Sequence, residues 1–250
     1  MRDLCHAARF QYEKGEPIMD RPTPLMLKEI ILFRGLSEAE LERLAADMWI
    51  ENRRKGELLS AGSPFVGTAW FVFRGIVELY TITRQGGRKI LFFQGPGRLL
   101  NMNVTGSSAD KHLGRAAADT MLLCMDRDIL ARHVLASPIL IQALFAHYET
   151  KLWRLSHQLK NTAGSVYIER KFSAKLLKLA ADFGKSWEEG TVITFDLTIT
   201  QMADYIGVPR ESASRACRKL QELGLVRYEN RRFYIPDIKK LSDFRREVKS

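Results

Sequence analysis

Cysteine is scarce in this chain of 250 residues. Only Cys5, Cys124 and Cys217 occur, and they lie far apart in the sequence. Scattered thiols make neither the paired framework of a disulfide-rich protein nor the closely spaced ligand set of a zinc site. We therefore expect reduced thiols and no metal centre.

Long apolar runs are also missing. The longest, such as 69–73 and 121–125, fall far below the ~20 residues that a membrane helix needs. The N-terminus lacks the succession of basic, apolar and small residues typical of a signal peptide. The sequence therefore predicts a cytoplasmic protein without membrane association.

What is present indicates a globular, basic protein. The hydrophobic fraction is 46% and the charged fraction 27%, which are ordinary globular values. At this length two domains, each with a core, are expected. A net charge of +10 and a pI near 9.6 predict attraction to polyanions, although charge alone does not distinguish nucleic acid from an anionic membrane surface.

Residues 200–225, TQMADYIGVPRESASRACRKLQELGL, predict two short helices joined by a tight turn. Thr200 can cap the first helix, which we expect to end at Gly207. Pro209 stands near the start of the second helix, where its missing N–H costs nothing. Apolar residues recur at helical spacing on one face of that second helix: Ala213, Ala216, Cys217, Leu220 and Leu223.

The opposite face of the second helix carries the chemistry of base recognition. Arginine can donate two hydrogen bonds to guanine, glutamate can accept from cytosine N4, and serine can serve either kind of base. The residues predicted to read bases are Arg210, Glu211, Ser214 and Arg215. The alternative is an ordinary solvated face, on which Glu211 and Arg215 form an i,i+4 surface pair.

Two short β-forming runs follow, at 225–228 and 233–235, joined by the polar turn 229–232. They predict a small wing beside the helix pair. Contacts with DNA phosphates position a protein without specifying sequence. We expect such contacts from Thr200, Gln201, Arg218, Arg231 and Arg232.

The first half of the chain changes from helix to strand periodicity. Ser37 and Glu40 make a capping box before SEAELERLAADM, which predicts a helix. From Arg53 onward short β-rich segments alternate with glycine turns, including two strands about Gly86 and Gly87. This pattern favours a closed or sandwiched β domain.

Together these motifs resemble the CRP/FNR family of bacterial transcription regulators. VPRESASRACRKLQELGLVRY followed by RRFYIPDIKKL is similar to the family's DNA-binding domain, with an RExxSR helix, the glycine turn and the wing in order. Upstream, four segments follow the order found in the family's cyclic-nucleotide-binding β-roll: KGELLSAGSP, FVFRGIVELY, GGRKILFFQGPG and GRAAADT.

The resemblance implies an α+β fold with a cupin-like, cyclic-nucleotide-binding-like β-roll, a long dimerisation helix and a C-terminal winged helix-turn-helix. The expected domains are an N-terminal arm at 1–25, an effector-sensing β-roll at 26–136, a dimerisation helix and hinge at 137–164, and a DNA-binding domain at 165–250. It further implies a homodimer on an inverted repeat with TGA-type half-site cores, with RNA polymerase as a partner.

The effector implied by the resemblance is not cyclic AMP. Relatives that bind cyclic AMP have Gly-Glu and Arg-Ser-Ala in the phosphate cassette, where this chain has Asn101-Met102 and Arg115-Ala116-Ala117. Two lost hydrogen bonds at roughly 1 to 3 kcal/mol each would weaken binding about a hundredfold or more. Arg115 is still present, so an anionic ligand is one alternative. The other is that Arg115 is a structural ion-pair partner.

A small organic or aromatic effector is therefore expected, as in the halorespiration regulators of the same family. The predicted effector-binding residues are Leu100, Asn101, Met102, Arg115, Ala116, Lys151, Leu155 and Ser156. The chain has too few cysteines for the iron-sulfur branch of the family. Haem remains an alternative, with Cys5, His6, His112 and Cys124 as nominal ligands outside any haem motif.

After Pro138 an amphipathic helix carries Ile141, Leu144, Tyr148, Leu152, Leu155, Leu159 and Thr162 near a coiled-coil stripe. The stripe favours self-association, and the alternative is that it only covers the β-roll. Gly164 and Ser165 are the expected hinge before a second helix that ends at Gly184.

No acid and base pair, nucleophile constellation or phosphate loop indicates an enzyme. We therefore expect a homodimeric, effector-responsive transcription regulator. The alternatives are a haem-based gas sensor of the same family, a ligand-binding regulatory subunit that acts on a protein partner, and a constitutive DNA-binding protein with an inert sensor.

Overall fold

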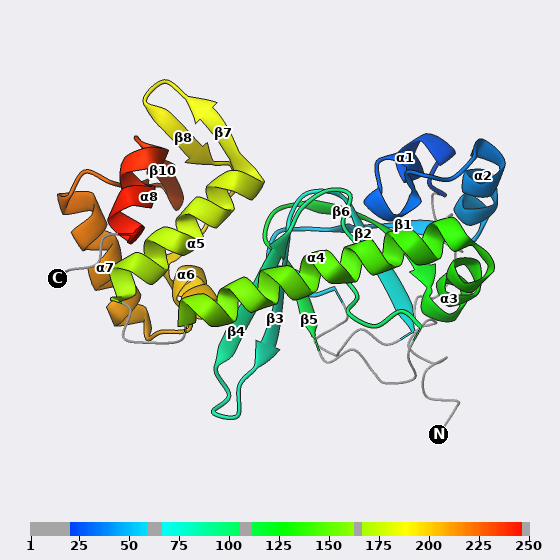
Figure 1. Ribbon diagram of the computed structural model, residues 1–250, viewed down its shortest axis with the longest axis horizontal. Coiled ribbons are helices and arrows are strands. Elements are labelled where there is room, and N and C mark those ends of the chain that lie inside the picture. The colour runs from blue at the N-terminus through cyan, green and yellow to red at the C-terminus, as the bar shows by residue number, and fades with distance from the viewer. Residues whose placement is uncertain (1–20, 60–66, 106–111, 163–166, 247–250) are drawn as a thin grey trace, which may run out of the picture.

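The structure is a computed structural model that describes residues 21–59, 67–105, 112–162 and 167–246 (Figure 1). Its first half contains α1 (Pro24–Lys28), η2 (Ile31–Phe33), α2 (Glu38–Ala46), β1 (Met48–Arg53), β2 (Thr68–Arg74), β3 (Val77–Ile82), β4 (Arg88–Gln94), β5 (Leu113–Ala116), β6 (Thr120–Asp126) and α3 (Arg127–Ala136). The second half contains α4 (Pro138–Thr162), α5 (Ile168–Phe183), β7 (Gly184–Trp187), β8 (Gly190–Ile193), α6 (Ile199–Ile206), α7 (Arg210–Glu222), β9 (Arg227–Glu229), β10 (Arg232–Ile235) and α8 (Ile238–Arg246).

Strands β1 to β6 form a β-roll of two antiparallel sheets, ordered β1-β6-β2 and β4-β3-β5, which we call the sensor after its predicted role. Successive side chains of a strand point to opposite faces. In β3, Val77 and Leu79 therefore pack inside the roll with Trp70 and Phe92, whereas Glu78 lies on the outer face. The outer face of β4-β3-β5 is turned toward the C-terminal domain.

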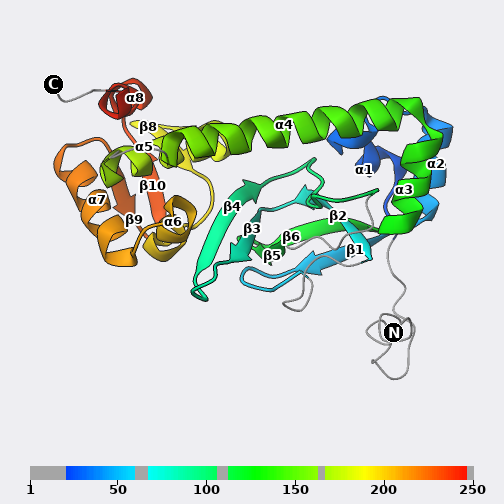
Figure 2. The ribbon, with the colours of Figure 1, turned by 60° about the horizontal axis from the view of Figure 1, so that its bottom comes forward.

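Helix α4 runs along the β-roll from α3 toward α5, as Figure 2 shows. One side of it packs on the sensor: Leu140 and Leu144 join the core under the N-terminal helices, and Leu155 packs on the interior of the β-roll. The other side leaves Phe145 65% and Leu152 66% exposed. The predicted apolar stripe is thus divided between a face that covers the sensor and a face that is exposed in the single chain.

The C-terminal domain surrounds a sheet ordered β7-β8-β10-β9 with α5, α6, α7 and α8. Strands β9 and β10 form the predicted wing. The sequence did not predict β1, α3, α8 or the β7–β8 hairpin. The hairpin strands have four residues each, too few to show a period; β7 pairs with β8, and β8 pairs with β10. Gly190 allows this approach, because a Cβ there would meet the carbonyl oxygen of Ile235 at 2.3 Å.

One hydrophobic cluster contains residues from both halves of the chain. Ile90 and Phe93 on the outer face of the sensor sheet join the cluster that contains Phe172, Met202 and Leu220 of the C-terminal domain. Burial of large apolar side chains stabilises such a contact by roughly 1.5 to 3 kcal/mol per residue. This arrangement places the sensor and the C-terminal domain in direct contact.

Within the ranges that the structure describes, no single helix has both the length and the apolar character to cross a membrane. One bent pair, Arg127–Ala136 with Pro138–His157 at 115°, passes by length and composition alone.

Candidate nucleic-acid interface and sensor site

The first helix of the predicted pair is capped by Thr198, not by Thr200. Thr198 has extended backbone angles, and its hydroxyl accepts a hydrogen bond from the Gln201 backbone at 3.1 Å. The Gln201 side chain accepts in return from the Thr198 backbone at 3.0 Å. This is a capping box, and the spacing of Thr198 and Gln201 was the signal for it in the sequence. The prediction that Thr200 caps the first helix was wrong. Thr198 is the N-cap, because Gln201 stands three residues after it and completes the capping box.

The turn between the helices is as predicted. Gly207 ends α6 in the left-handed conformation, with φ of 86°, which glycine adopts without steric cost. Pro209 is the residue that precedes the first turn of α7. The buried side of α7 consists of Ala213, Ala216, Cys217 and Leu220.

The opposite side of α7 is the candidate DNA-reading face. Arg210, Glu211 and Arg215 are exposed, and Ser214 is half-buried between them. Arg215 Nη2 donates to Ser212 Oγ at 3.0 Å, one turn earlier in the same helix. In the described part of the chain no ion pair joins Glu211 to Arg215, so the alternative surface pair is not formed. The predicted base-reading set therefore shares one accessible face.

The wing ends in a tight turn whose central residues, Asn230 and Arg231, have φ of 50° and 64°. Two successive positive φ angles match a type I′ hairpin turn. Arg231 is exposed, and Arg232 Nε pairs with Asp196 Oδ1 at 3.3 Å. Asp196 also binds Lys55 Nζ of the sensor at 2.6 Å. Hydrogen bonds from Lys55 first, and from Arg232, hold the pKa of Asp196 below its usual value.

The residues predicted to contact phosphate fall into two groups. Thr200, Arg218 and Arg231 are exposed. Gln201 is engaged elsewhere, because Nε2 donates to Glu78 Oε2 of the sensor at 2.9 Å while Oε1 completes the α6 cap. In this arrangement the Gln201 side chain links α6 to the outer face of the β-roll, and its contact with phosphate stays a prediction.

The outer face of the sensor sheet carries polar contacts that sequence reasoning missed. Arg88 pairs with Glu78 at 2.9 Å and with Asp204 of α6 at 2.8 Å. Lys89 Nζ donates to the Tyr205 carbonyl oxygen at 2.9 Å. Arg88 and Asp204 are 116 positions apart in the sequence, so no local pattern could have paired them.

The structure brings together part of the predicted effector set. Leu100, Asn101, Ala116 and Lys151 are buried, and Lys151 Nζ donates to the carbonyl oxygens of Leu100 and Asn101 at 3.2 and 2.8 Å. The Asn101 side chain accepts from the Trp70 backbone and donates to the Thr68 carbonyl, each at 2.9 Å. The amide of Asn101 therefore ties the loop to β2.

Arg115 is separated from that interior set. In β5 it lies opposite Glu78, whereas Ala116 lies opposite Val77. Cross-strand partners share a face of the sheet, so Arg115 stands on the outer face, where its Nε is 3.5 Å from Glu78 Oε1. This position is compatible with the alternative prediction of a structural ion-pair partner, although Arg115 Nε makes no hydrogen bond within the described residues. Ser156 is exposed, Leu155 packs on the interior, and Met102 is half-buried.

Neither described cysteine is in a reactive setting. Cys124 in β6 and Cys217 in α7 are buried and free. Burial raises the pKa of both thiols, that of Cys217 to about 11. Among the residues that the structure describes, no group of three or more His, Cys, Asp or Glu side chains could hold a metal ion. Cys5 and His6, named above as nominal haem ligands, lie outside the described residues, as do the hinge positions Gly164 and Ser165.

Comparison with known proteins matches this arrangement. The family model described as a Crp-like helix-turn-helix domain matches residues 171–244. A CRP-like cAMP-activated global transcriptional regulator of Mycobacterium tuberculosis is 20% identical over 84% of this chain and 94% of its own length. Residues 171–244 thus match a Crp-like helix-turn-helix domain, and the chain as a whole is similar to CRP-like transcription regulators.

Solved structures share the fold of this chain across most of its length. FixK2 of Bradyrhizobium japonicum matches with a TM-score of 0.67 at 18% identity, over 78% of this chain and 96% of that chain. The c-di-GMP responsive regulator CLP of Xanthomonas campestris matches with a TM-score of 0.69 at 18% identity, over 80% and 100%. These likenesses show the fold, and the helix pair α6–α7 lies within the residues that match the Crp-like helix-turn-helix domain.

Proposed function

We propose that this regulator binds an inverted repeat with TGA-type half-sites as a homodimer and changes its DNA affinity when a small-molecule effector binds. The observation that carries the proposal is the exposed face of α7, where Arg210, Glu211, Ser214 and Arg215 are grouped. Two such helices in a symmetric dimer would enter successive major grooves ~34 Å apart. RNA polymerase would be the downstream partner.

The exposed side of α4 is the proposed dimer interface. Phe145 and Leu152 stand seven residues apart on the side that does not cover the sensor, which is the spacing of a coiled-coil seam. Leu152→Glu should convert the dimer to monomer, because a carboxylate would be buried without a partner. Leu135→Glu is the matched control, because Leu135 in α3 is equally exposed, at 67% compared with 66%.

The effector would be a small organic or anionic molecule other than cyclic AMP. Two features support this choice. The side-chain amide of Asn101 is hydrogen-bonded to the backbone of β2, and Arg115 lies beside Glu78 outside the roll. A ribose and a cyclic phosphate would therefore lack their partners at these positions.

Native mass spectrometry of freshly purified protein tests dimerisation and bound ligand in one measurement. We expect a dimer mass for the parent and for Leu135→Glu, and a monomer mass for Leu152→Glu. Any retained effector or haem would appear as added mass. Selection of DNA sites from a random pool tests binding to an inverted repeat. Recovery of no common inverted repeat would overturn the proposal.

A further inference from the structure

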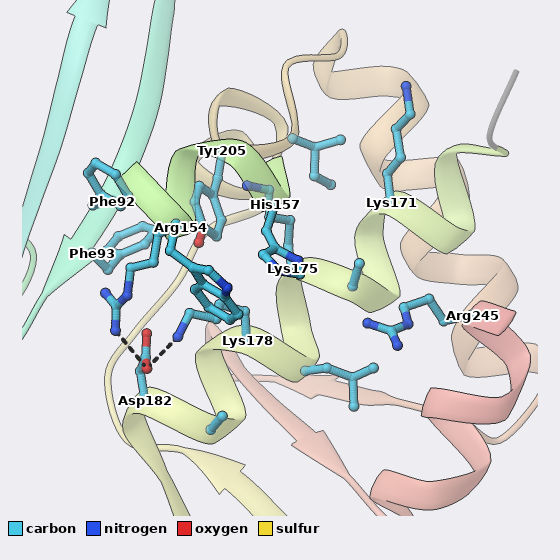
Figure 3. Close-up of a pocket in the computed structure, with 15 residues that line it drawn as sticks. Phe92, Phe93, Arg154, His157, Lys171, Lys175, Lys178, Asp182, Tyr205 and Arg245 are labelled. Carbon is cyan, nitrogen blue, oxygen red and sulfur yellow. Dashed lines mark hydrogen bonds and ion pairs between the residues drawn. The ribbon is translucent and has the colours of Figure 1, made fainter. Parts of the chain in front are cut away.

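A cavity of about 310 Å³ lies where α4, α5, α6 and β4 meet (Figure 3). None of the predicted effector-binding residues lines it. Its walls come from the sensor through Phe92 and Phe93, from the end of α4 through Trp153, and from α6 through Tyr205. The cavity is therefore lined by the β-roll, by α4 and by the C-terminal domain, which are the parts that would move relative to one another in the proposed response to an effector.

The cavity is strongly basic. Five basic side chains and one acidic side chain line it: Arg154, Lys171, Lys175, Lys178, Arg245 and Asp182. Asp182 is already shared, since its Oδ1 is 2.7 Å from Lys178 Nζ and 3.4 Å from Arg154 Nη2. Lys175 and Arg245 have no ion pair with any described carboxylate. In Figure 3 Lys175 extends toward Tyr205, Arg245 comes from α8, and Lys171 points away.

Lys175 is a half-buried cation with no counter-ion among the described residues. Its ammonium lies 3.9 Å from the centroid of the Tyr205 ring. Burial first, and the charge of Lys89 second, lower the pKa of Lys175 to about 7. An anion beside it would oppose both effects, because opposite charge favours the protonated form.

The remaining walls are apolar and aromatic. Phe92 and Tyr205 are buried with one side toward the cavity, and Trp153 is 61% exposed at its rim. Such a combination, an apolar cleft with a few convergent polar groups, is the usual composition of a small-molecule site. It suits a ligand with a flat apolar body and one anionic group.

We propose that this cavity is a binding site for a small aromatic anion, with Lys175 holding the anionic group and Trp153, Phe92 and Tyr205 contacting the aromatic body. Because the occupant contacts α4, α5 and α6 together, it would favour the arrangement of sensor and DNA-binding domain in which these walls converge. That regulatory consequence rests on the proposed DNA-binding function, whereas binding itself does not.

The test uses the full-length protein without DNA and a fluorescent probe, 8-anilinonaphthalene-1-sulfonate. Its uncharged analogue N-phenyl-1-naphthylamine has the same rings without the sulfonate. We expect Lys175→Met to weaken sulfonate binding about tenfold, the loss of one charge-assisted hydrogen bond, while binding of the neutral analogue stays within about twofold. Ala174→Phe, which fills the cavity, should abolish binding of both probes.

Lys185→Met is the matched control, because Lys185 in β7 is an exposed lysine outside the cavity. It should bind both probes as the parent does. Circular dichroism and a thermal melt check that each variant is folded. The proposal is overturned if Lys175→Met and Lys185→Met bind the sulfonate equally, or if Ala174→Phe, correctly folded, retains both probes. Neither outcome depends on whether the protein binds DNA.

Discussion

Arginines serve opposite purposes on two surfaces of this regulator. On α7, Arg210 and Arg218 are exposed, with no ion pair to any residue in the described ranges. On the outer face of β4-β3-β5, Arg88 and Arg115 converge on Glu78, whose side chain is fully buried. Charge that is left unpaired is available to an external anion such as DNA, whereas charge paired around a buried carboxylate holds the protein together.

Removing the buried carboxylate should have the largest effect. Glu78→Gln leaves Arg88 without one of its two partners and weakens the contact with Gln201 of α6. We expect a loss of about 3 kcal/mol in the free energy of unfolding, since breaking a buried pair strands a charge. Chemical denaturation measures it. Glu222→Gln, at a 58% exposed carboxylate, is the control and should stay near the parent value, and a similar small change for Glu78→Gln would contradict this role.

Arginine substitutions on the two surfaces should have separate effects. Arg215→Ala should lower affinity for the selected DNA site by about 1 to 3 kcal/mol, relax the preference at one base pair and leave the stability unchanged. Arg115→Ala should lower stability and leave base preference unchanged. Binding curves on specific and random DNA, with melts of both variants, measure this. Equal weakening by Arg215→Ala on both DNAs would mean that Arg215 contacts only phosphate.

The contact between the two domains should strengthen as pH rises above about 7. Burial is the main cause that lowers the pKa of Lys175 to about 7 and that of Lys89 to about 8. In the unfolded chain both lysines keep protons that the folded state has lost, so stability rises with pH until the ordinary lysine pKa is passed. The slope is at most about 1.4 kcal/mol per pH unit for each proton.

Urea denaturation at several pH values between 7 and 10 measures this slope. Lys175→Met should reduce it by removing one of the two protons, and Lys185→Met should not. A slope that is the same in the parent and in Lys175→Met would show that Lys175 is not titrating in the folded state.

The smallest effect concerns the wing. Arg231→Asn, which keeps a residue tolerant of positive φ, should lower the salt slope of DNA binding by up to about one unit per protomer without altering the ranking of sequences. Arg232→Asn should lower it less, because Arg232 is already paired with Asp196. Equal slopes for the parent and Arg231→Asn would place the wing away from DNA.

Local sequence was sufficient for elements whose cause is local. The αL glycine at 207, the proline before α7 and the alternation of Ala213 and Leu220 with exposed arginines predict the helix pair, because caps, turns and helical periodicity act within a few residues. The same holds for the capping box at Ser37. Thr198 was missed only because a second threonine stands two positions later.

Strand sidedness and domain contacts needed the tertiary structure. A one-residue change of register turns a side chain from one face of a sheet to the other, and the register of β3 with β5 places Arg115 outside the roll beside Glu78. The partners of Arg88 and Lys55 lie more than a hundred positions away, at Asp204 and Asp196. The sequence by itself therefore determined the helix pair α6–α7 and the wing, while only the packing of the β-roll against α6 decided which charges are paired and where a basic cavity remains.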